Sequence, residues 1–286
     1  MSGFSFEFFP PRNAEGVERL RETRKTLAVL QPEYFSVTFG AGGSTRDGTR
    51  ETVEAILRED RIPPAPHLSC VSSTRHELRQ MLDHYSSIGV RRIVALRGDL
   101  PSGTGGSHGD FRHAAELVAF IREHYSNHFR IEVAAYPEMH PQAPNAQRDL
   151  DYFIAKVNAG ADAAITQYFF NVDAYTDFIE RLRAQQCDVP VIPGIMPILN
   201  ASQLLRFSDA CGAEIPRYIR KRLESFADDG ASIQAFGLDV VTRLCERLLA
   251  EGAPGLHFYS MNQARPMLEL WKRLGLDPRT TPTQNQ

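Results

Sequence analysis

The chain has 286 residues, of which 42% are hydrophobic, so it can bury a substantial core and is not expected to be disordered. Its net charge of −3 gives no electrostatic basis for binding nucleic acid or an anionic membrane surface. We find no signal sequence and no apolar run long enough to span a bilayer, so we expect a cytoplasmic protein without a membrane partner. The four widely spaced cysteines predict free thiols.

Short apolar runs alternate with amphipathic helical patterns along the whole chain. The apolar runs predict strands near residues 4–9, 34–39, 66–71, 92–97, 130–135, 163–169, 190–195 and 255–260. Helical patterns such as "TRHELRQMLDHYSSIG" fill the intervals between them. This alternation predicts an α/β protein with a parallel sheet, and about eight units favour a (β/α)₈ TIM barrel. An open, doubly wound sheet is the alternative.

One unit departs from this regular pattern. The segment from Asn200 to Glu251, which follows the seventh predicted strand, is too long for a single helix. We expect it to hold extra helices over the mouth of the barrel. We expect residues 1–276 to form a single catalytic domain, and residues 277–286 to form a polar C-terminal tail.

The stretch "FSFEFFPP" places one carboxylate, Glu7, among four phenylalanines. In a strand, Phe4, Phe6 and Phe8 point to one face and Glu7 to the other. In a barrel the phenylalanines would face the helices, and Glu7 would point inward near the C-terminal end of its strand, where TIM barrels form active sites. Burial there would raise the pKa of Glu7, which makes it a candidate general acid.

Polar residues recur at the ends of the other predicted strands. They are Thr38, His67, Arg97, Gly98, Asp99, Tyr136, Glu138, His140, Gln167 and the stretch 259–262. Each has an ordinary alternative: His67 as a core histidine, or Arg97 and Asp99 as a structural ion pair. Their shared position at one face of a barrel favours a functional site.

Several chemistries find no support in the sequence. No lysine lies at the end of a predicted strand, and neither a P-loop nor a Rossmann glycine motif is present. His67 and His140 are too few for a catalytic metal site. Glu7 with Glu138 could serve a glycoside hydrolase, but the single tryptophan, Trp271, lies near the C-terminus rather than in a sugar-binding row.

Eight stretches together resemble the methylenetetrahydrofolate reductase family. They are "SFEFFPPR", "SVTFGAGGS", "PHLSC", "RRIVALRGDLP", "VAAYPEMHP", "AGADAAITQYFF", "VIPGIMPI" and "HFYSMN". The resemblance covers nearly the whole chain and is to the short bacterial members. It implies a barrel that binds FAD and catalyses a ping-pong reaction. A hydride passes from NADH or NADPH to the flavin, and then to 5,10-methylenetetrahydrofolate, giving 5-methyltetrahydrofolate for methionine synthesis. It also implies a homo-oligomer.

The resemblance assigns roles to individual positions. Glu7 matches the acid that protonates the departing nitrogen as the folate ring opens, and Asp99 matches an aspartate near the flavin and the pterin. Gln167 matches the amide that recognises folate. Gln203, Phe207 and Gln263 match positions that contact folate or nicotinamide. The flavin positions are Thr38, His67, Arg97, Gly98, Asp99, His113, Ala114, Tyr136, His140, Asp149 and Lys156.

Two of these positions, and two residues near Lys156, depart from the family pattern. His113 stands where a tyrosine is common, and Gln263 stands where an arginine usually follows. Tyr152 and Ala155 replace polar or basic residues on the predicted helix that carries Lys156.

A non-catalytic regulator that binds folate or flavin on the same barrel is a further alternative. The choice between NADH and NADPH stays open, with NADH favoured by analogy to the bacterial relatives.

Overall fold

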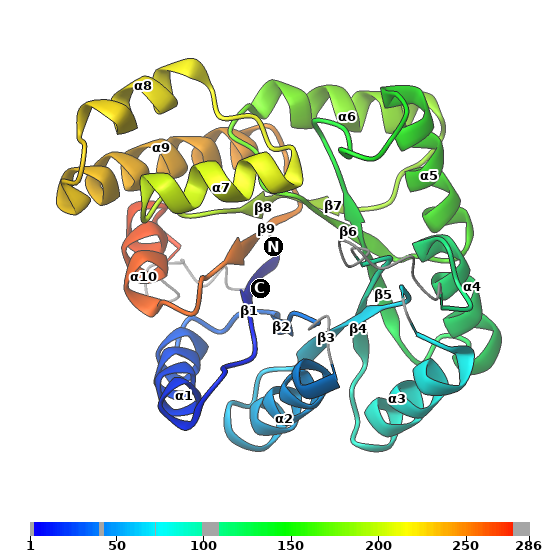
Figure 1. The fold of residues 1–286 in the computed structure, drawn as a ribbon. Coiled ribbons are helices and arrows are strands. Elements are labelled where there is room, and N and C mark those ends of the chain that lie inside the picture. The colour runs from blue at the N-terminus through cyan, green and yellow to red at the C-terminus, as the bar shows by residue number, and fades with distance from the viewer. Residues whose placement is uncertain (1–2, 40–42, 72, 99–108, 277–286) are drawn as a thin grey trace, which may run out of the picture.

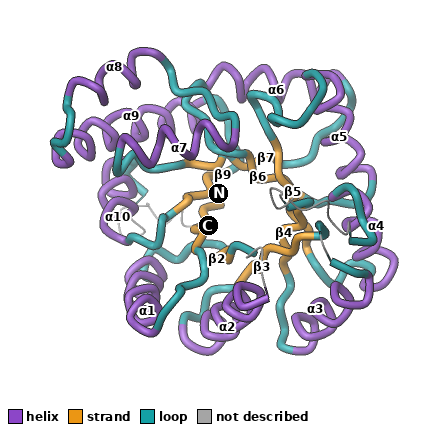
Figure 2. Tube along the Cα trace, in the orientation of Figure 1, coloured by secondary structure: helices purple, strands orange, loops and turns teal. Residues whose placement is uncertain are grey.

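A ring of parallel strands lies at the centre of the molecule, with helices around it (Figure 1). The computed structural model describes residues 3–39, 43–71, 73–98 and 109–276. The tube in Figure 2 shows the strands as the inner ring and the helices as the outer one. Asp99 and the predicted tail, 277–286, lie outside the described residues.

Nine strand segments form one sheet in the order β7-β6-β5-β4-β3-β2-β1-β9-β8. They are β1 (Gly3–Phe8), β2 (Tyr34–Val37), β3 (Pro64–Ser69), β4 (Arg92–Leu96), β5 (Arg130–Ala135), β6 (Ala163–Thr166), β7 (Val191–Ile192), β8 (Gly194–Ile195) and β9 (Gly255–Tyr259). Each overlaps a range predicted from the sequence. All pairings are parallel, as expected when helices connect successive strands.

The seventh predicted strand is divided into β7 and β8 at Pro193, which has no N–H to donate. β7 pairs with β6, and β8 pairs with β9, so this one stretch joins the two ends of the sheet. The Pro193 carbonyl still accepts a hydrogen bond from the His257 N–H at 2.9 Å. The sheet is therefore a nearly closed barrel, which confirms the (β/α)₈ prediction and rules out the open sheet.

Helices follow the strands in the described part of the chain. They are α1 (Ala14–Ala28), α2 (Gly43–Glu59), α3 (Arg75–Ser87), α4 (Ala114–Tyr125), α5 (Ala146–Asn158), α6 (Val172–Ala184), α7 (Ala201–Cys211), α8 (Arg217–Ser225), α9 (Gly230–Ala250) and α10 (Ala264–Arg273). Side chains of Asn13, Thr74 and Asn145 accept hydrogen bonds from N–H groups of the first turns of α1, α3 and α5. Such caps explain where these helices begin. No described helix is both long and apolar enough to cross a membrane.

Three helices, α7, α8 and α9, occupy the interval between β8 and β9, as the long segment after the seventh strand predicts. They lie together on one side of the barrel in Figure 1. Asn200 caps α7 through the Gln203 N–H, and Gly212 ends it in the left-handed conformation that glycine tolerates. This arrangement places Gln203 on the first turn of α7, at the barrel's edge.

The main core lies between the strands and the surrounding helices. Phe6, Phe8 and Phe258 are fully buried there, and the Phe6 ring lies 5.4 Å from that of Phe258 and 5.9 Å from that of Trp271 on α10. Each such side chain contributes roughly 1.5–3 kcal/mol through burial of apolar surface. The outward direction predicted for the phenylalanines of β1 is confirmed, and β1 therefore turns Glu7 toward the barrel axis.

Candidate active site

A cavity of about 420 Å³ opens at the C-terminal ends of the strands. Its lining includes Arg46 on α2 and residues on or just beyond every strand of the ring except β7. These are Glu7, Thr38, Phe39, His67, Ser69, Val71, Val94, Leu96, Gly98, Ala134, Tyr136, Ile165, Gln167, Met196 and Tyr259. Seven of these were predicted from the sequence as site residues: Glu7, Thr38, His67, Gly98, Tyr136, Gln167 and, within the stretch 259–262, Tyr259. The C-terminal face of the barrel is where TIM-barrel enzymes form active sites.

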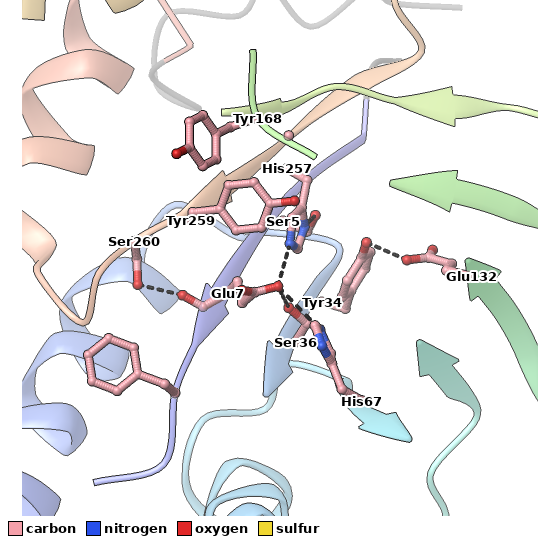
Figure 3. A network of polar contacts seen from close by, with 12 residues as sticks. Ser5, Glu7, Tyr34, Ser36, His67, Glu132, Tyr168, His257, Tyr259 and Ser260 are labelled. Carbon is pink, nitrogen blue, oxygen red and sulfur yellow. Dashed lines mark hydrogen bonds and ion pairs between the residues drawn. The ribbon is translucent and has the colours of Figure 1, made fainter. Parts of the chain in front are cut away.

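The carboxyl of Glu7 lies between two imidazoles at this cavity (Figure 3). Its Oε2 atom is 3.2 Å from His67 Nε2 and 3.3 Å from His257 Nε2. The His257 contact has hydrogen-bond geometry, whereas the His67 contact is close without that alignment. The Ser36 hydroxyl donates a longer hydrogen bond to the same oxygen at 3.5 Å. One carboxylate oxygen thus meets three polar side chains from β2, β3 and β9.

The predicted raised pKa of Glu7 is wrong. Burial does raise the pKa, but the charge of His67, the hydrogen bond from His257 and the charge of His257 outweigh it and lower the pKa to about 2. The prediction from the sequence assumed that the phenylalanines surround the carboxyl of Glu7. Because they lie on the opposite face of β1, the carboxyl instead faces histidines that arrive from β3 and β9.

His257 contacts Glu7 in the site and was not identified by the sequence analysis. It is fully buried on β9, and its Nδ1 lies 2.7 Å from the Ser5 hydroxyl. The register of the β1–β9 pair sets Ser5 opposite His257 and Glu7 opposite Tyr259. The alternation of Gly255, His257 and Tyr259 in "GLHFY" is the signal that could have placed His257 on the inner face.

The end of β1 is held by the loop that follows β9. The Ser260 hydroxyl donates to the Glu7 carbonyl at 2.6 Å, and the Asn262 amide both donates to the Phe9 carbonyl and accepts from the Phe9 N–H. The backbone is thereby held at Glu7 itself and at Phe9, two residues beyond it. The stretch 259–262, predicted as part of the site, has this positioning role.

Gly98 and Gln167 occupy the cavity wall as predicted. Gly98 has φ of +84°, and a Cβ there would lie 1.9 Å from Ser69 Oγ, so both the conformation and the close approach require glycine. Gln167 follows β6, and its Oε1 accepts from the Tyr168 N–H at 3.0 Å.

The remaining predicted cofactor positions lie beside the cavity rather than in its lining. The Arg97 guanidinium contacts Gln142, and Asp149 accepts a hydrogen bond from the His140 N–H at 2.9 Å. Asp149 and Tyr136 share an adjoining pocket of about 140 Å³, and Tyr136 lines both spaces. Ala114 is the first residue of α4. These positions extend from the central cavity along one side of the barrel.

Lys156 on α5 points its ammonium toward the Ala134 carbonyl, next to the cavity wall. Burial lowers the pKa of Lys156 to about 8, and the charge of Asp149 opposes this shift. Two residues that depart from the family pattern are also in contact here: the rings of His113 and Tyr152 stack, with their centroids 5.5 Å apart. Tyr152 is 39% exposed and presents an aromatic face at the surface.

The predicted substrate positions divide into two groups. Gln203 and Phe207 on α7 line a small pocket with Met196, and Met196 also lines the central cavity. Gln263 immediately precedes α10 and does not line the cavity. Glu138, the partner required for a glycoside hydrolase, also lies outside the cavity lining, and its Oε2 accepts from the Glu214 N–H at 2.8 Å. The hydrolase alternative therefore loses its second carboxylate.

Comparisons with known proteins agree on one family. The family model described as methylenetetrahydrofolate reductase matches residues 2–275. The chain is 39% identical over 274 residues to the 5,10-methylenetetrahydrofolate reductase of Salmonella typhimurium, with 96% of this chain and 91% of that one covered. It is 36% identical over 287 residues to methylenetetrahydrofolate reductase (NADH) 1 of Arabidopsis thaliana, with 96% and 48% covered.

A solved structure adds a likeness of fold alone. It is an uncharacterized protein from Clostridium thermocellum, described as binding two copies of 5-methyl-5,6,7,8-tetrahydrofolic acid. The TM-score is 0.67 at 18% identity, with 97% of this chain and 94% of that chain covered. The family match over nearly the whole sequence and the identity to the Salmonella enzyme decide the assignment: the chain belongs to the methylenetetrahydrofolate reductase family of oxidoreductases.

Proposed function

We propose that the chain reduces 5,10-methylenetetrahydrofolate to 5-methyltetrahydrofolate with NADH or NADPH as the donor, using FAD bound in the central cavity. The observation that carries this proposal is the position of Glu7. Its carboxyl is buried against two imidazoles and still lines a cavity of about 420 Å³. A proton donor at the base of an open cavity suits a substrate ring that must be protonated before it accepts a hydride.

The cavity wall fits a flat flavin ring. Val94, Leu96 and Ala134 offer small apolar surface, and Gly98 keeps the backbone close without a side chain. Thr38, His67 and Gln167 bring hydrogen-bonding groups from separate strands to the same lining. When bound, FAD would accept a hydride from the nicotinamide and supply it to the folate.

Positively charged side chains beside the cavity suit the rest of the cofactor. Arg97 and Lys156 lie next to the wall, and either would stabilise a pyrophosphate by charge-assisted hydrogen bonds. The stacked rings of His113 and Tyr152 offer aromatic surface on the same side of the barrel. These contacts support FAD rather than a smaller flavin, because they continue away from the central cavity.

Glu7 would donate its proton to the nitrogen that leaves when the imidazolidine ring opens. Gln167 would recognise the pterin edge, because an amide both donates and accepts. Phe207, with Gln203 beside it on α7, would stack on the flat rings of folate or nicotinamide. Asp99 lies outside the described residues, and we keep its proposed role near the flavin and the pterin. We likewise keep the proposed contact of Gln263 with the folate tail.

Three further parts of the proposal rest on the sequence and the family resemblance rather than on the geometry of the site. We propose a cytoplasmic homo-oligomer, a preference for NADH, and a role in supplying methyl groups for methionine synthesis. The name of the Arabidopsis relative includes NADH, which supports the donor only weakly.

The visible absorption spectrum of the purified protein tests the proposal. We expect a flavin band that anaerobic NADH bleaches and that methylenetetrahydrofolate restores. A colourless protein that does not bind added FAD would overturn the assignment of the cofactor. A flavin that NADH reduces but that methylenetetrahydrofolate leaves reduced would overturn the assignment of the substrate.

A further inference from the structure

The cavity at the C-terminal ends of the strands contains one cationic side chain that the proposed function does not use. Arg46, near the start of α2, is the only arginine or lysine among the described residues that line this cavity. Its side chain is 25% exposed, so it is neither deeply buried nor loose on the surface. The remaining acidic or basic groups of this lining, Glu7 and His67, already have places in the proposed reaction.

Neighbouring side chains hold the guanidinium of Arg46 in one orientation. Its Nη2 donates to the Ser73 hydroxyl at 3.0 Å, and its Nη1 donates to Glu77 Oε1 at 3.3 Å. The guanidinium also lies over the Phe39 ring, 5.5 Å from its centre, and Phe39 lines the cavity as well. An arginine held in this way presents its donors to a ligand with little further loss of side-chain entropy.

Ser73 connects Arg46 to a fixed part of the barrel. It is fully buried, and its hydroxyl donates to the Ser69 carbonyl at 3.3 Å. Its own carbonyl accepts a hydrogen bond from the Asp110 N–H at 3.1 Å. Ser69 lies at the end of β3 and lines the cavity. The position of Arg46 is therefore set by the end of a barrel strand.

Glu77 is not a dedicated partner of Arg46. Its Oε2 accepts hydrogen bonds from both the N–H and the hydroxyl of Thr74, which completes the capping box at the start of α3. These hydrogen bonds from Thr74 lower the pKa of Glu77. Glu77 is also 44% exposed, and ion pairs with exposed carboxylates contribute little stability. The ion pair alone therefore gives little reason for an arginine at the cavity wall.

The guanidinium of Arg46 suits an anionic group of a ligand. Its planar set of N–H donors matches the oxygens of phosphates and carboxylates. Each of the three proposed ligands carries such a group: FAD and the nicotinamide dinucleotide have a pyrophosphate, and folate has the carboxylates of its glutamate tail. The place of Arg46 in the ring of strands and helices decides among them.

The pyrophosphate of FAD has proposed partners elsewhere. The Arg97 guanidinium contacts Gln142, which follows β5, and Lys156 lies on α5. Both partners lie beyond β4 as the ring is followed from α2. FAD placed along that side leaves the wall at α2 unused.

The glutamate tail of folate is also proposed to lie elsewhere. Gln203 is on the first turn of α7, and Gln263 immediately precedes α10. In Figure 1, α7 lies across the ring from α2 and α3. The wall between Phe39 and Ser73 is therefore left for the third ligand, the nicotinamide dinucleotide.

We propose that Arg46 binds the pyrophosphate of the nicotinamide dinucleotide, and that Ser73 and Glu77 position it for this contact. This inference rests on the proposed function and adds to it the part of the cavity wall that recognises the hydride donor. One partly exposed arginine supplies a contact of moderate strength. Such a contact allows the oxidised dinucleotide to leave before folate enters the same cavity.

The first test measures binding of the dinucleotide to the oxidised holoenzyme, in which FAD already fills its own site. The protein is titrated by calorimetry with the oxidised form of whichever donor, NADH or NADPH, reduces the wild-type flavin faster. ADP-ribose, which keeps the pyrophosphate and lacks the nicotinamide, is the second ligand. In Arg46→Met we expect the Kd of both ligands to rise about tenfold, through loss of a charge-assisted hydrogen bond. Added salt should weaken binding more in the wild type than in the variant.

Two further variants distinguish a lost contact from a damaged site. Glu77→Gln keeps the capping box, because glutamine also accepts from Thr74, but removes the anion beside the guanidinium. It should lower the Kd of the dinucleotide by about twofold to threefold, the opposite direction from damage. Arg50→Met removes an exposed cation on the same helix, outside the cavity lining, and should bind like the wild type. Unchanged binding in Arg46→Met, or weakened binding in Glu77→Gln, would overturn the proposal.

The second test compares two hydride donors. N-benzyl-1,4-dihydronicotinamide has the reacting ring of NADH and no phosphate. In Arg46→Met, the second-order rate constant for flavin reduction by the dinucleotide should fall about tenfold, and that for the benzyl compound should stay close to the wild-type value. An equal loss with both donors would show a distorted flavin site and contradict the proposed role. A loss confined to the KM of methylenetetrahydrofolate would assign Arg46 to the folate tail instead and would also contradict it.

The two tests separate this inference from the proposed function. Dinucleotide binding that depends on Arg46, in a protein whose reduced flavin does not react with methylenetetrahydrofolate, would leave the assignment of Arg46 standing and remove the proposed reaction. An active reductase whose affinity for the dinucleotide does not depend on Arg46 would remove the assignment of Arg46 alone.

Discussion

Glu7 is the one carboxylate among the described residues that line the cavity. Its lowered pKa, about 2, means that the Glu7 carboxyl itself takes up a proton from solution only in strong acid. A proton that Glu7 donates near neutral pH would therefore have to come through a neighbouring group, and the two imidazoles are in contact with it. A substrate nitrogen placed above Glu7 would compete with His257 for that proton, which is how a carboxyl with a low pKa can still act as the acid.

Glu7→Gln should separate the two half-reactions. We expect the variant to bind FAD and to be bleached by NADH, because neither step needs a proton from this side chain. Reoxidation by methylenetetrahydrofolate should fall by about 10²- to 10⁴-fold, the usual contribution of a general acid. Stopped-flow absorbance of the flavin measures both rates, and near-normal reoxidation would remove Glu7 from the acid role.

The direction of Glu7 could be predicted from the sequence, but its electrostatic surroundings could not. Strand alternation within "FSFEFF" is local, so it fixed the inward face before any contact was known. His67 and His257 are 60 and 250 residues away along the chain, and only the register of β1 with its neighbours brings His257 to the carboxyl. The predicted pKa was wrong because it used only the sequence neighbours of Glu7.

At the scale of elements, the β1–β9 contact holds the acid in place. Ser260 is fully buried, donates to the Glu7 carbonyl and accepts from the Asn262 N–H at 3.1 Å. Ser260→Ala should lower the free energy of unfolding by about 0.5–1.5 kcal/mol, because it removes a hydrogen bond to the Glu7 carbonyl, which still accepts from the residue 260 N–H at 3.3 Å, and one from the Asn262 N–H. Urea unfolding measures this. Ser225→Ala, which removes an exposed hydroxyl contact at the end of α8, is the control and should cost less.

Helix α5 places one ammonium at the cavity wall, and its contribution to cofactor binding is testable. Lys156→Met keeps most of the side-chain volume but removes the charge that would stabilise the FAD pyrophosphate. We expect faster loss of FAD on dilution, followed by flavin fluorescence. Lys25→Met on α1, which removes an exposed ion pair with Glu22, is the matched control. Equal retention of FAD in both variants would make Lys156 a structural residue.

The order and type of the strands and helices could be predicted from the sequence more completely than the contacts between them. The alternation of strands and helices, and the long interval after the seventh strand, predicted the barrel and its extra helices. The break at Pro193 and the passage of α7 beside Met196 were not predicted, since both depend on how the ring closes. The positions of Asp149 and Lys156 beside the cavity came from the family resemblance, and their roles stay predictions.

Across the whole molecule, the inner and outer layers of the barrel are built by different means. The outer layer is apolar, with Phe6 and Phe258 fully buried against α10. The inner layer holds a buried ion pair, Arg92 with Glu132, beneath the site. No local pattern could reveal this pair with Tyr34, since Glu132 lies 98 residues from Tyr34 and 40 from Arg92. The outer layer thus resembles an ordinary apolar core, whereas the inner layer contains charged groups below the cavity lining.

The stability of the whole barrel should depend on pH through Lys156. Its pKa is about 8 in the folded protein, against 10.5 for an ordinary lysine, which is the value expected in the unfolded chain. Below pH 8 both states hold the proton, and burial of the ammonium is a constant cost. Between pH 8 and 10.5 the unfolded state binds more protons than the folded one, so the stability that this group contributes rises with pH, by at most about 3 kcal/mol.

The difference between the wild type and Lys156→Met isolates this effect from all other titrations. In FAD-free protein, the wild type should gain free energy of unfolding relative to the variant as the pH rises through this window. Denaturant unfolding at a series of pH values measures the difference, and Lys25→Met should follow the wild type throughout. A difference that stays constant from pH 8 to 10.5 would show that the folded barrel does not disfavour the charged form, and that Lys156 reaches solvent or an anion.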